Sequence, residues 1–279
     1  MSILDTILDY KRTVEVPSRI RYCPLNDVRR LAEQTAPPRD FASALRRAIS
    51  QDNHIALIAE VKRASPSKGD LVKGEFRPVE LAQQYATHGA SAISVLTDEP
   101  YFKGSLSYLT QVKHAVSIPT LRKDFIVDAY QLYEARVAGA DAALLIVAAL
   151  DDALLRDLFA LTQTLQLTAL VEVHDEAETE QALALGATLI GVNNRNLHNF
   201  VTDLQTTARC ASIVAATPDP SGQRVLVSES GIFTPAHVAA VAIMGARAIL
   251  VGESIITSGD IPAQVAALSS VSADQVING

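Results

Sequence analysis

The stretch LTALVEVHDEAETEQALALGATLIGVNN, residues 167–194, contains two short apolar runs separated by a helical pattern. The runs 167–174 and 188–194 are rich in Leu, Val, Ile and Thr and have the length of strands. The pattern 175–187 between them begins with an aspartate that can cap a helix. It ends in Gly-Ala, where the glycine can take the left-handed C-cap conformation. This order predicts a βα unit followed by a strand that pairs in parallel.

The same unit recurs along the chain after residue 54. Further apolar runs predict strands at 55–62, 90–97, 118–125, 142–150, 225–230 and 248–254. Other helical patterns lie between the runs, at 78–89, 128–140, 151–165 and 234–246. Eight such units fit a (β/α)8 TIM barrel better than an open doubly wound sheet, which more often has about five or six strands. No G-x-G-x-x-G follows the first run and no P-loop occurs in the sequence. We therefore predict an α/β fold with a single closed barrel.

Residues 1–50 lie outside this repeat and form a predicted helical N-terminal extension. The segments 2–12, 26–34 and 40–49 each place apolar residues at helical spacing behind a polar cap. Such helices could plug the bottom of the barrel or cover its mouth. No low-complexity linker separates them from the repeat, so we expect one domain, with the extension at 1–50 and the catalytic barrel at 51–279.

Composition narrows the class of protein. A chain of 279 residues is long enough for a barrel of about 250 residues, and 48% hydrophobic with 20% charged residues is a globular composition. The net charge of −7 argues against a general binder of nucleic acid or anionic membranes. Cys23 and Cys210 are far apart and have no histidine at metal spacing, so neither a disulfide framework nor a zinc site is expected.

The N-terminal residues also bear on location. They carry Asp5 and Asp9 among apolar side chains and lack the basic and apolar regions of a signal peptide. The longest apolar run, 142–150, is about half as long as a membrane span. We expect a cytoplasmic protein with no membrane partner.

Polar residues gather at the carboxyl ends of the predicted strands, where parallel barrels carry their active sites. The amino ends hold mostly Ile, Leu, Val and Ala. Because alternate residues of a strand share one face, Glu60 and Lys62 should point the same way, as should Leu121 with Lys123 and Leu170 with Glu172. Carboxylates and ammonium groups that converge in this way are suited to acid–base chemistry. The polar set at these ends is Glu60, Lys62, Lys123, Glu172, Asn193, Arg195, Glu229, Ser230 and Ser254.

Glycines in two loops indicate phosphate binding. Gly231 follows the seventh strand and Gly252 the eighth, and these loops form the usual phosphate site of such barrels. Lys62 and the segment 63–69 add cations and hydroxyls at the opposite rim. We therefore expect an anionic ligand with more than one charged end.

At these residues the chain resembles the indole-3-glycerol-phosphate synthase family. The resemblance runs along nearly the whole chain. The matching motifs are AEVKRASPSKG (59–69), TDEPYFKGS (97–105), LRKDFIVD (121–128), LVEVH (170–174), IGVNNRNL (190–197), VSESGI (227–232) and LVGES (250–254).

The resemblance implies a reaction. The small-molecule substrate would be 1-(2-carboxyphenylamino)-1-deoxyribulose 5-phosphate, which joins a phosphosugar to anthranilate. The products would be indole-3-glycerol phosphate, carbon dioxide and water, formed in tryptophan biosynthesis by a carboxy-lyase. The resemblance implies neither metal nor organic cofactor and no nucleic-acid partner, and it gives no prediction about association with other enzymes of the pathway.

The resemblance also implies residue roles. Lys123 matches the general acid of ring closure, and Glu172, Glu60 and Lys62 match the remaining acid–base residues. Asn193, in the same catalytic set, holds Arg195, which would orient the anthranilate part. The other predicted substrate contacts are the anion and phosphate contacts Ser65, Ser230, Gly231, Gly252 and Ser254, the apolar walls Phe102 and Phe125, and Glu229.

Other interpretations remain open at this stage. Glu60 with Lys123, or Glu172 with Lys62, could be structural salt bridges, which are not in themselves evidence of function. Asn193 could close a turn, the two phenylalanines could be core, and His174 is interpreted as structural or surface. An isomerase of a related aminosugar phosphate would need only one acid–base pair. A non-catalytic phosphate-binding barrel would not need Lys123 or Glu172.

Overall fold

A computed structural model describes residues 2–196 and 200–273, so the last residue of the motif 190–197 and the end of the predicted barrel segment, 274–279, lie outside the described residues. Eight parallel strands close into a barrel in the order β1-β10-β9-β8-β7-β6-β5-β4. Each strand lies within a run predicted from sequence, which confirms the (β/α)8 fold. The strands are β1 (Ala56–Val61), β4 (Ala92–Leu96), β5 (Thr120–Lys123), β6 (Ala142–Ile146), β7 (Thr168–Val173), β8 (Leu189–Asn193), β9 (Val225–Glu229) and β10 (Ala248–Val251).

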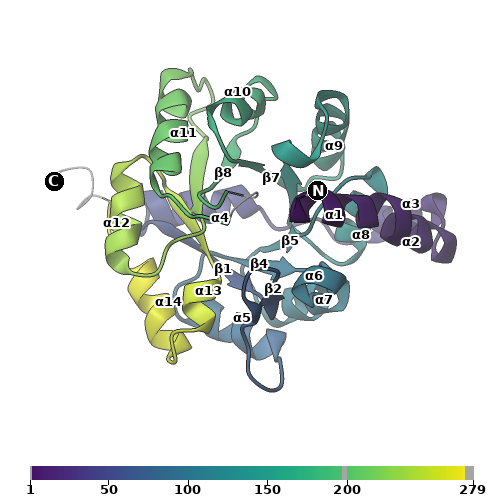
Figure 1. The fold of residues 1–279 in the computed structure, drawn as a ribbon, viewed down its shortest axis with the longest axis horizontal. Coiled ribbons are helices and arrows are strands. Elements are labelled where there is room, and N and C mark those ends of the chain that lie inside the picture. The colour runs from purple at the N-terminus through teal and green to yellow at the C-terminus, as the bar shows by residue number, and fades with distance from the viewer. Residues whose placement is uncertain (1, 197–199, 274–279) are drawn as a thin grey trace.

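Helices surround the barrel (Figure 1). The larger ones are α5 (Pro78–Thr87), α7 (Leu106–Ala115), α8 (Ala129–Val137), α9 (Asp152–Thr164), α10 (Glu176–Ala184), α11 (Gln205–Ala216), α12 (Pro235–Ile243) and α14 (Ile261–Ser269). The predicted caps are present: Asp175 accepts a hydrogen bond from the backbone N–H of Glu178, and Gly186 has a φ of +85°. In the described part of the chain, no helix is both long and apolar enough to cross a membrane.

Short elements decorate the loops at the carboxyl ends of the strands. The hairpin β2 (Ala64–Ser65) and β3 (Gly69–Asp70) follows β1, and α6 (Glu99–Phe102) follows β4. The run 142–150 was predicted as one strand, but only its first part stays in the sheet. Its end forms the 3-10 helix η2 (Val147–Ala149), in which Val147 and Ala149 remain buried. The short helix α13 (Glu253–Ile256) begins directly after β10.

The strands are buried on both faces, which explains their nearly continuous apolar sequences. Inward-facing side chains such as Ile58, Leu121 and Leu170 pack together inside the barrel. Outward-facing side chains such as Leu57 and Val171 pack against the surrounding helices. The residues two positions after Ile58, Leu121 and Leu170 therefore also face inward, as the strand alternation predicted.

The extension differs from its prediction in one respect. The first helix was expected to end at residue 12, but α1 (Ile3–Tyr10) continues through the π-helix η1 (Lys11–Glu15) into α2 (Val16–Tyr22). Pro17 lies inside this continuous helix, directly after the wider π-helical turn, which accommodates the proline ring and its missing N–H. The other two helices, α3 (Leu25–Gln34) and α4 (Phe41–Ser50), lie close to their predicted positions.

The extension closes one end of the barrel and borders the other. Phe41 and Leu45 of α4 are fully buried against Ala56 and Ala92, at the amino ends of β1 and β4. Figure 1 shows α1 nearer the viewer, beside β5 and β7, with α4 behind the barrel. The sequence left open whether the extension plugs the bottom of the barrel or covers its mouth. The structure shows both, with α4 at the bottom and α1 at the mouth.

One buried cation ties the extension to the barrel. The Lys11 side chain is fully buried, and its Nζ lies 2.9 Å from Glu15, 3.0 Å from Asp98 and 2.7 Å from Asp124. Asp98 follows β4, and Asp124 follows the last residue of β5. Burial lowers the pKa of Lys11, but the carboxylates of Asp124, Asp98 and Glu15 outweigh burial and raise the pKa above its ordinary value. The ammonium group therefore stays charged.

We predict that Lys11→Met destabilises the protein by about 3–5 kcal/mol, because the substitution leaves Asp98 and Asp124 buried without this cation. Urea unfolding measures the change. The control is Lys103→Met, which breaks a half-exposed pair with Asp70 and should cost less than about 1 kcal/mol. Equal stability of the two variants would contradict the anchoring role of Lys11.

Candidate active site

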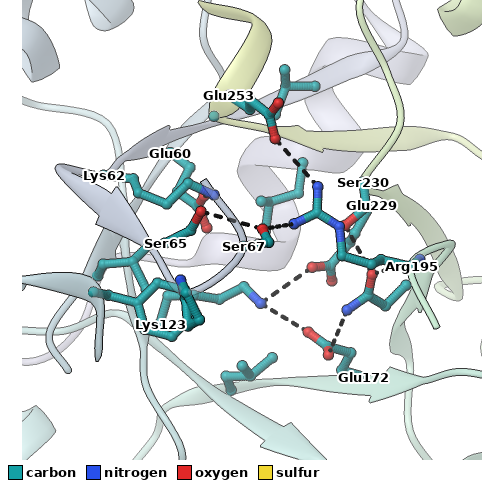
Figure 2. Close-up of a pocket in the computed structure, with 18 of the residues that line it drawn as sticks. Glu60, Lys62, Ser65, Ser67, Lys123, Glu172, Arg195, Glu229, Ser230 and Glu253 are labelled. Atoms are coloured by element: carbon teal, nitrogen blue, oxygen red, sulfur yellow. Dashed lines mark hydrogen bonds and ion pairs between the residues drawn. The ribbon is translucent and has the colours of Figure 1, made fainter. Parts of the chain in front are cut away.

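One cavity opens at the carboxyl ends of the strands, and every site residue predicted from sequence lines it. The strand ends supply Glu60, Lys123, Glu172 and Glu229, while loops, α13 and α1 supply the rest of the wall. Figure 2 shows the charged side chains pointing toward a common centre from several strands. The predicted residues in the lining are Glu60, Lys62, Ser65, Phe102, Lys123, Phe125, Glu172, Asn193, Arg195, Glu229, Ser230, Gly231, Gly252 and Ser254.

Lys123, the last residue of β5, lies at this centre (Figure 2). Its Nζ is 2.8 Å from Glu172 Oε2 and 3.4 Å from Glu229 Oε2. Burial lowers the pKa of Lys123, but Glu172, Glu229 and Glu60 together outweigh burial and raise the pKa above its ordinary value. The cavity therefore presents an ammonium group that stays charged among carboxylates.

The ion pairs differ from those considered from sequence. The structural alternative paired Glu60 with Lys123 and Glu172 with Lys62, whereas Lys123 contacts Glu172 and Lys62 contacts Glu60 at 2.5 Å. The reason is geometric: Glu60 and Lys62 extend from the end of the same strand, while β5 and β7 are separated only by β6. Glu60 acts on Lys123 through its charge without an ion-pair contact.

Glu172 contacts three polar side chains. Its Oε2 accepts from Lys123, and its Oε1 accepts from Asn193 Nδ2 at 3.0 Å and lies 3.3 Å from His174 Nε2. Burial raises the pKa of Glu172, but Lys123 and His174 outweigh burial and hold it well below the ordinary value. Glu172 is therefore an ionised base at neutral pH.

Glu229 has the opposite character. It is buried, its Oε2 faces Lys123, and its Oε1 has no hydrogen-bond partner among the described residues. Burial, opposed by Lys123 and reinforced by Glu172 and Glu60, raises the pKa of Glu229 to about 7. Glu172 and Glu229 thus differ in protonation because Glu172 also contacts Asn193 and His174, in addition to the Lys123 that both carboxylates face.

Gly252, which follows β10, leaves space for the carboxylate of Glu60. A Cβ at Gly252 would lie 2.6 Å from Glu60 Oε2, so any side chain there would displace Glu60. The sequence assigned Gly252 to a phosphate-binding loop. The structure shows that Gly252→Val would disturb Glu60 as well, so it cannot test phosphate binding alone.

The loop after β9 has an unusual backbone. Ser230 has a φ of +66°, which is uncommon for a residue with a side chain, and Gly231 follows with a φ of +81°. The Ser230 hydroxyl donates to Asn193 Oδ1 at 2.9 Å, which helps to hold this conformation. Ser254 donates its hydroxyl to the carbonyl of Ile232 and so links this loop to α13. Its predicted contact with an anion stays a prediction.

Arg195 lies across the mouth of the cavity (Figure 2). Its guanidinium donates to Glu253 at 3.3 Å and to Ser67 at 3.4 Å, and its backbone N–H donates to Asn193 Oδ1 at 3.1 Å. Ser67 lies in turn 3.5 Å from Ser65, in the loop after β1. Asn193 therefore does more than close a turn, because it orients both Arg195 and Glu172.

Some lining residues were not predicted from sequence. Ile3 and Ile7 of α1 form part of the wall, and Glu253 holds Arg195. Nothing local in the sequence signals that α1 reaches the mouth, since its apolar spacing is that of any amphipathic helix. The predicted walls Phe102 and Phe125 do face the cavity, with ring centroids 5.9 Å apart.

A closed parallel barrel with ionised acids and bases at its carboxyl-terminal rim defines a (β/α)8-barrel enzyme that works by acid–base chemistry. The family model for indole-3-glycerol phosphate synthase matches residues 4–268, and the chain belongs to this family. The resemblance found in the sequence is thereby confirmed. Enzymes of this family are carboxy-lyases of tryptophan biosynthesis.

Similar proteins support the same assignment. An indole-3-glycerol phosphate synthase of Roseiflexus sp. (strain RS-1) is 53% identical over 95% of this chain and 97% of its own length. That of Polaromonas sp. (strain JS666 / ATCC BAA-500) is 50% identical over 92% and 94%. Among solved structures, a thiamine phosphate pyrophosphorylase from Pyrococcus furiosus has a TM-score of 0.58 at 16% identity, over 80% of this chain and 98% of its own. This last likeness concerns the fold alone.

We predict that Glu229→Gln becomes more stable relative to the wild type as pH rises. Glu229 ionises at about pH 7 in the folded protein and near its ordinary pKa of 4.5 when unfolded, so the folded state holds the extra proton between these values. Wild-type stability therefore falls through this window, and glutamine cannot ionise. Urea unfolding at pH 5 and pH 8 should show the difference growing by on the order of 2 kcal/mol.

The matched control is Glu180→Gln, at an exposed position of α10. This variant shows how loss of a surface carboxylate alone changes stability at each pH. If the difference between Glu229→Gln and the wild type did not change with pH, Glu229 would be ionised throughout.

Proposed function

We propose that this chain converts 1-(2-carboxyphenylamino)-1-deoxyribulose 5-phosphate into indole-3-glycerol phosphate, carbon dioxide and water. Family membership across residues 4–268 supports the reaction. The observation that carries the proposal is the Lys123 ammonium, which faces the cavity between Glu172 and Glu229. The proposed location is the cytoplasm, as expected from the sequence.

Ring closure is the first step that the geometry supports. The aromatic carbon attacks the sugar carbonyl, and the carbonyl oxygen takes a proton from Lys123 to become a hydroxyl. Glu172 and Glu229 keep Lys123 protonated before the reaction, which offsets the cost of burying its charge. The apolar walls Phe102 and Phe125 suit the aromatic ring of the substrate.

The later steps need a proton acceptor and a proton donor. Loss of carbon dioxide returns its electron pair to the ring system. The hydroxyl then leaves as water after taking a second proton, and one further proton must be removed to complete the indole. Glu172 is ionised and so suits proton removal, while Lys62, paired with Glu60 across the cavity, is the second ammonium group available.

Two ends of the cavity suit the two anionic ends of the substrate. Arg195 offers a planar guanidinium for the anthranilate carboxylate. The loop carrying Ser230 and Gly231 and the start of α13 at Gly252 correspond to the common phosphate position of such barrels. In this proposal the carboxylate of the substrate takes over the place that Glu253 holds beside Arg195.

The competing functions fit the cavity less well. An isomerase needs one acid–base pair, but two lysine–carboxylate pairs face this cavity. A phosphate sensor would need neither pair. The direct test is to incubate the purified protein with the substrate and follow indole absorbance and fluorescence. The sequence contains no Trp, so the optical background is low. Absence of an indole signal from folded protein would contradict the proposal.

We predict that Lys123→Met lowers turnover by about 100-fold or more while substrate still binds, because a general acid typically contributes at least that factor. Lys123→Arg should not restore activity, since a guanidinium keeps the charge but does not release its proton near neutral pH. The indole assay and a binding measurement give both readouts.

The matched control is Lys113→Met. Lys113 also forms a partly buried pair, with Asp141, but it belongs to α7 and does not line the cavity. It should lose stability and retain turnover per folded molecule. If Lys123→Met kept a third or more of wild-type turnover, or simply unfolded, Lys123 would be a structural partner of Glu172.

We predict that Arg195→Lys raises KM by about 10-fold or more although the charge is retained, because lysine cannot form two parallel hydrogen bonds to a carboxylate. Steady-state kinetics with the indole assay measures this change. Arg209→Lys serves as the matched control, since Arg209 also pairs with carboxylates, Glu176 and Asp203 at 3.4 Å, but does not line the cavity. A KM for Arg195→Lys within twofold of wild type would make Arg195 a distant counter-charge.

A further inference from the structure

His174 lies directly behind the proposed base. It follows the end of β7, two residues after Glu172, and does not line the cavity. Its Nε2 is 3.3 Å from Glu172 Oε1, and its Nδ1 is 3.0 Å from Glu178 Oε2 on α10. The same Glu178 oxygen accepts the backbone N–H of His174 at 2.9 Å. The imidazole therefore lies between two carboxylates: Nδ1 is hydrogen-bonded to Glu178, whereas Nε2 is at ion-pair distance from Glu172 and has no hydrogen-bond partner among the described residues. The sequence did not predict this arrangement.

The charge of the ring follows from these contacts. Burial lowers the pKa of His174, but Glu172 and Glu178 outweigh burial and raise it to about 10. The charged groups around the ring are Glu172 on β7 and Glu178 on α10, with Lys123 on β5 and Glu229 on β9 beyond Glu172. At neutral pH the ring is an imidazolium that lies within ion-pair distance of two carboxylates.

The two oxygens of Glu172 thus have separate surroundings. Oε2 meets Lys123 inside the cavity, whereas Oε1 meets Asn193 and His174. If the ring were absent, Oε1 would keep only the neutral amide of Asn193, and burial would act against the charge of Glu172 with Lys123 as its remaining cation. During the proposed reaction Lys123 gives up its proton, so its support for the charge of Glu172 is lost at that moment.

We propose that His174 is a positioning residue: its imidazolium, oriented by Glu178, fixes Glu172 Oε1 and keeps Glu172 ionised while Lys123 donates its proton to the substrate. The inference rests on the function proposed above. It adds a permanent cation outside the cavity, whose charge does not change during turnover. It also explains why a carboxylate lies near each ring nitrogen, since both carboxylates attract the charged form of the ring.

The test uses His174→Gln, which keeps a hydrogen-bonding side chain and removes the charge. The carboxyl carbon of Glu172, followed by NMR with labelled glutamate over a pH series, should show its pKa rising by at least about one pH unit. In the indole assay kcat should fall about 10-fold or more, with KM within about twofold. The acid limb of kcat/KM should move to higher pH, because Glu172 must be ionised to act and is protonated more easily without His174.

His174→Arg, which restores a cation, should recover part of the loss in kcat. His114→Gln, at an exposed position on α7, is the matched control and should change nothing. If His174→Gln does not fold, Glu178→Gln takes its place and should shift the pKa of Glu172 in the same direction by a smaller amount.

The titration separates this inference from the proposed function, since it needs no turnover. A change in the Glu172 pKa below about 0.3 pH unit in a folded variant would overturn the role of His174. Suppose instead that the Glu172 pKa rises in His174→Gln as expected, but the wild-type protein forms no indole. The proposed function would then be overturned, while His174 would keep its role as a buried counter-charge.

Discussion

The burial of the Lys123 ammonium at the mouth of an apolar barrel is the constraint from which the rest of the site follows. A buried cation is tolerated only beside carboxylates, and Glu172 and Glu229 supply them. Those carboxylates are buried in turn, so each depends on further groups. Glu172 accepts a hydrogen bond from Asn193 and lies beside His174, and His174 in turn pairs with Glu178. Glu229 has fewer partners and keeps its proton up to about pH 7. The polar groups of the site thus form one connected network around the Lys123 ammonium.

Much of this arrangement could be predicted from the sequence because a closed barrel imposes simple rules. Buried strands are apolar on both faces, and inward residues alternate, so Glu60, Lys123 and Glu172 had to face one space. The partner of each charge could not be predicted, since it depends on the order and register of strands around the barrel. The extension was predicted as helices, but the position of α1 depends on Lys11 meeting Asp98 and Asp124, and no local pattern reveals those contacts. His174 was interpreted as structural or surface for a different reason: its partners are near in sequence, but the sequence does not show that the turn after β7 brings Glu178 of α10 back to the ring.

Glycine positions illustrate a related limit. The sequence suggested that Gly252 leaves space for a ligand, and the structure shows that it also leaves space for Glu60. Gly191 does the same on β8, where an added Cβ would collide with Glu229 Oε1. Glycines inside a crowded barrel thus also leave space for the buried carboxylates of neighbouring strands. Such a role becomes visible only when the opposing side chain is known.

The buried Lys11 has a consequence for how the protein is made. Translation runs from the N-terminus, so Lys11 leaves the ribosome well before Asp98 and Asp124 are synthesised. Its carboxylate partners on the barrel do not yet exist at that stage, and Ile3 and Ile7 have no cavity wall to join. This segment therefore cannot take its final position until the strands that carry its partners have been made.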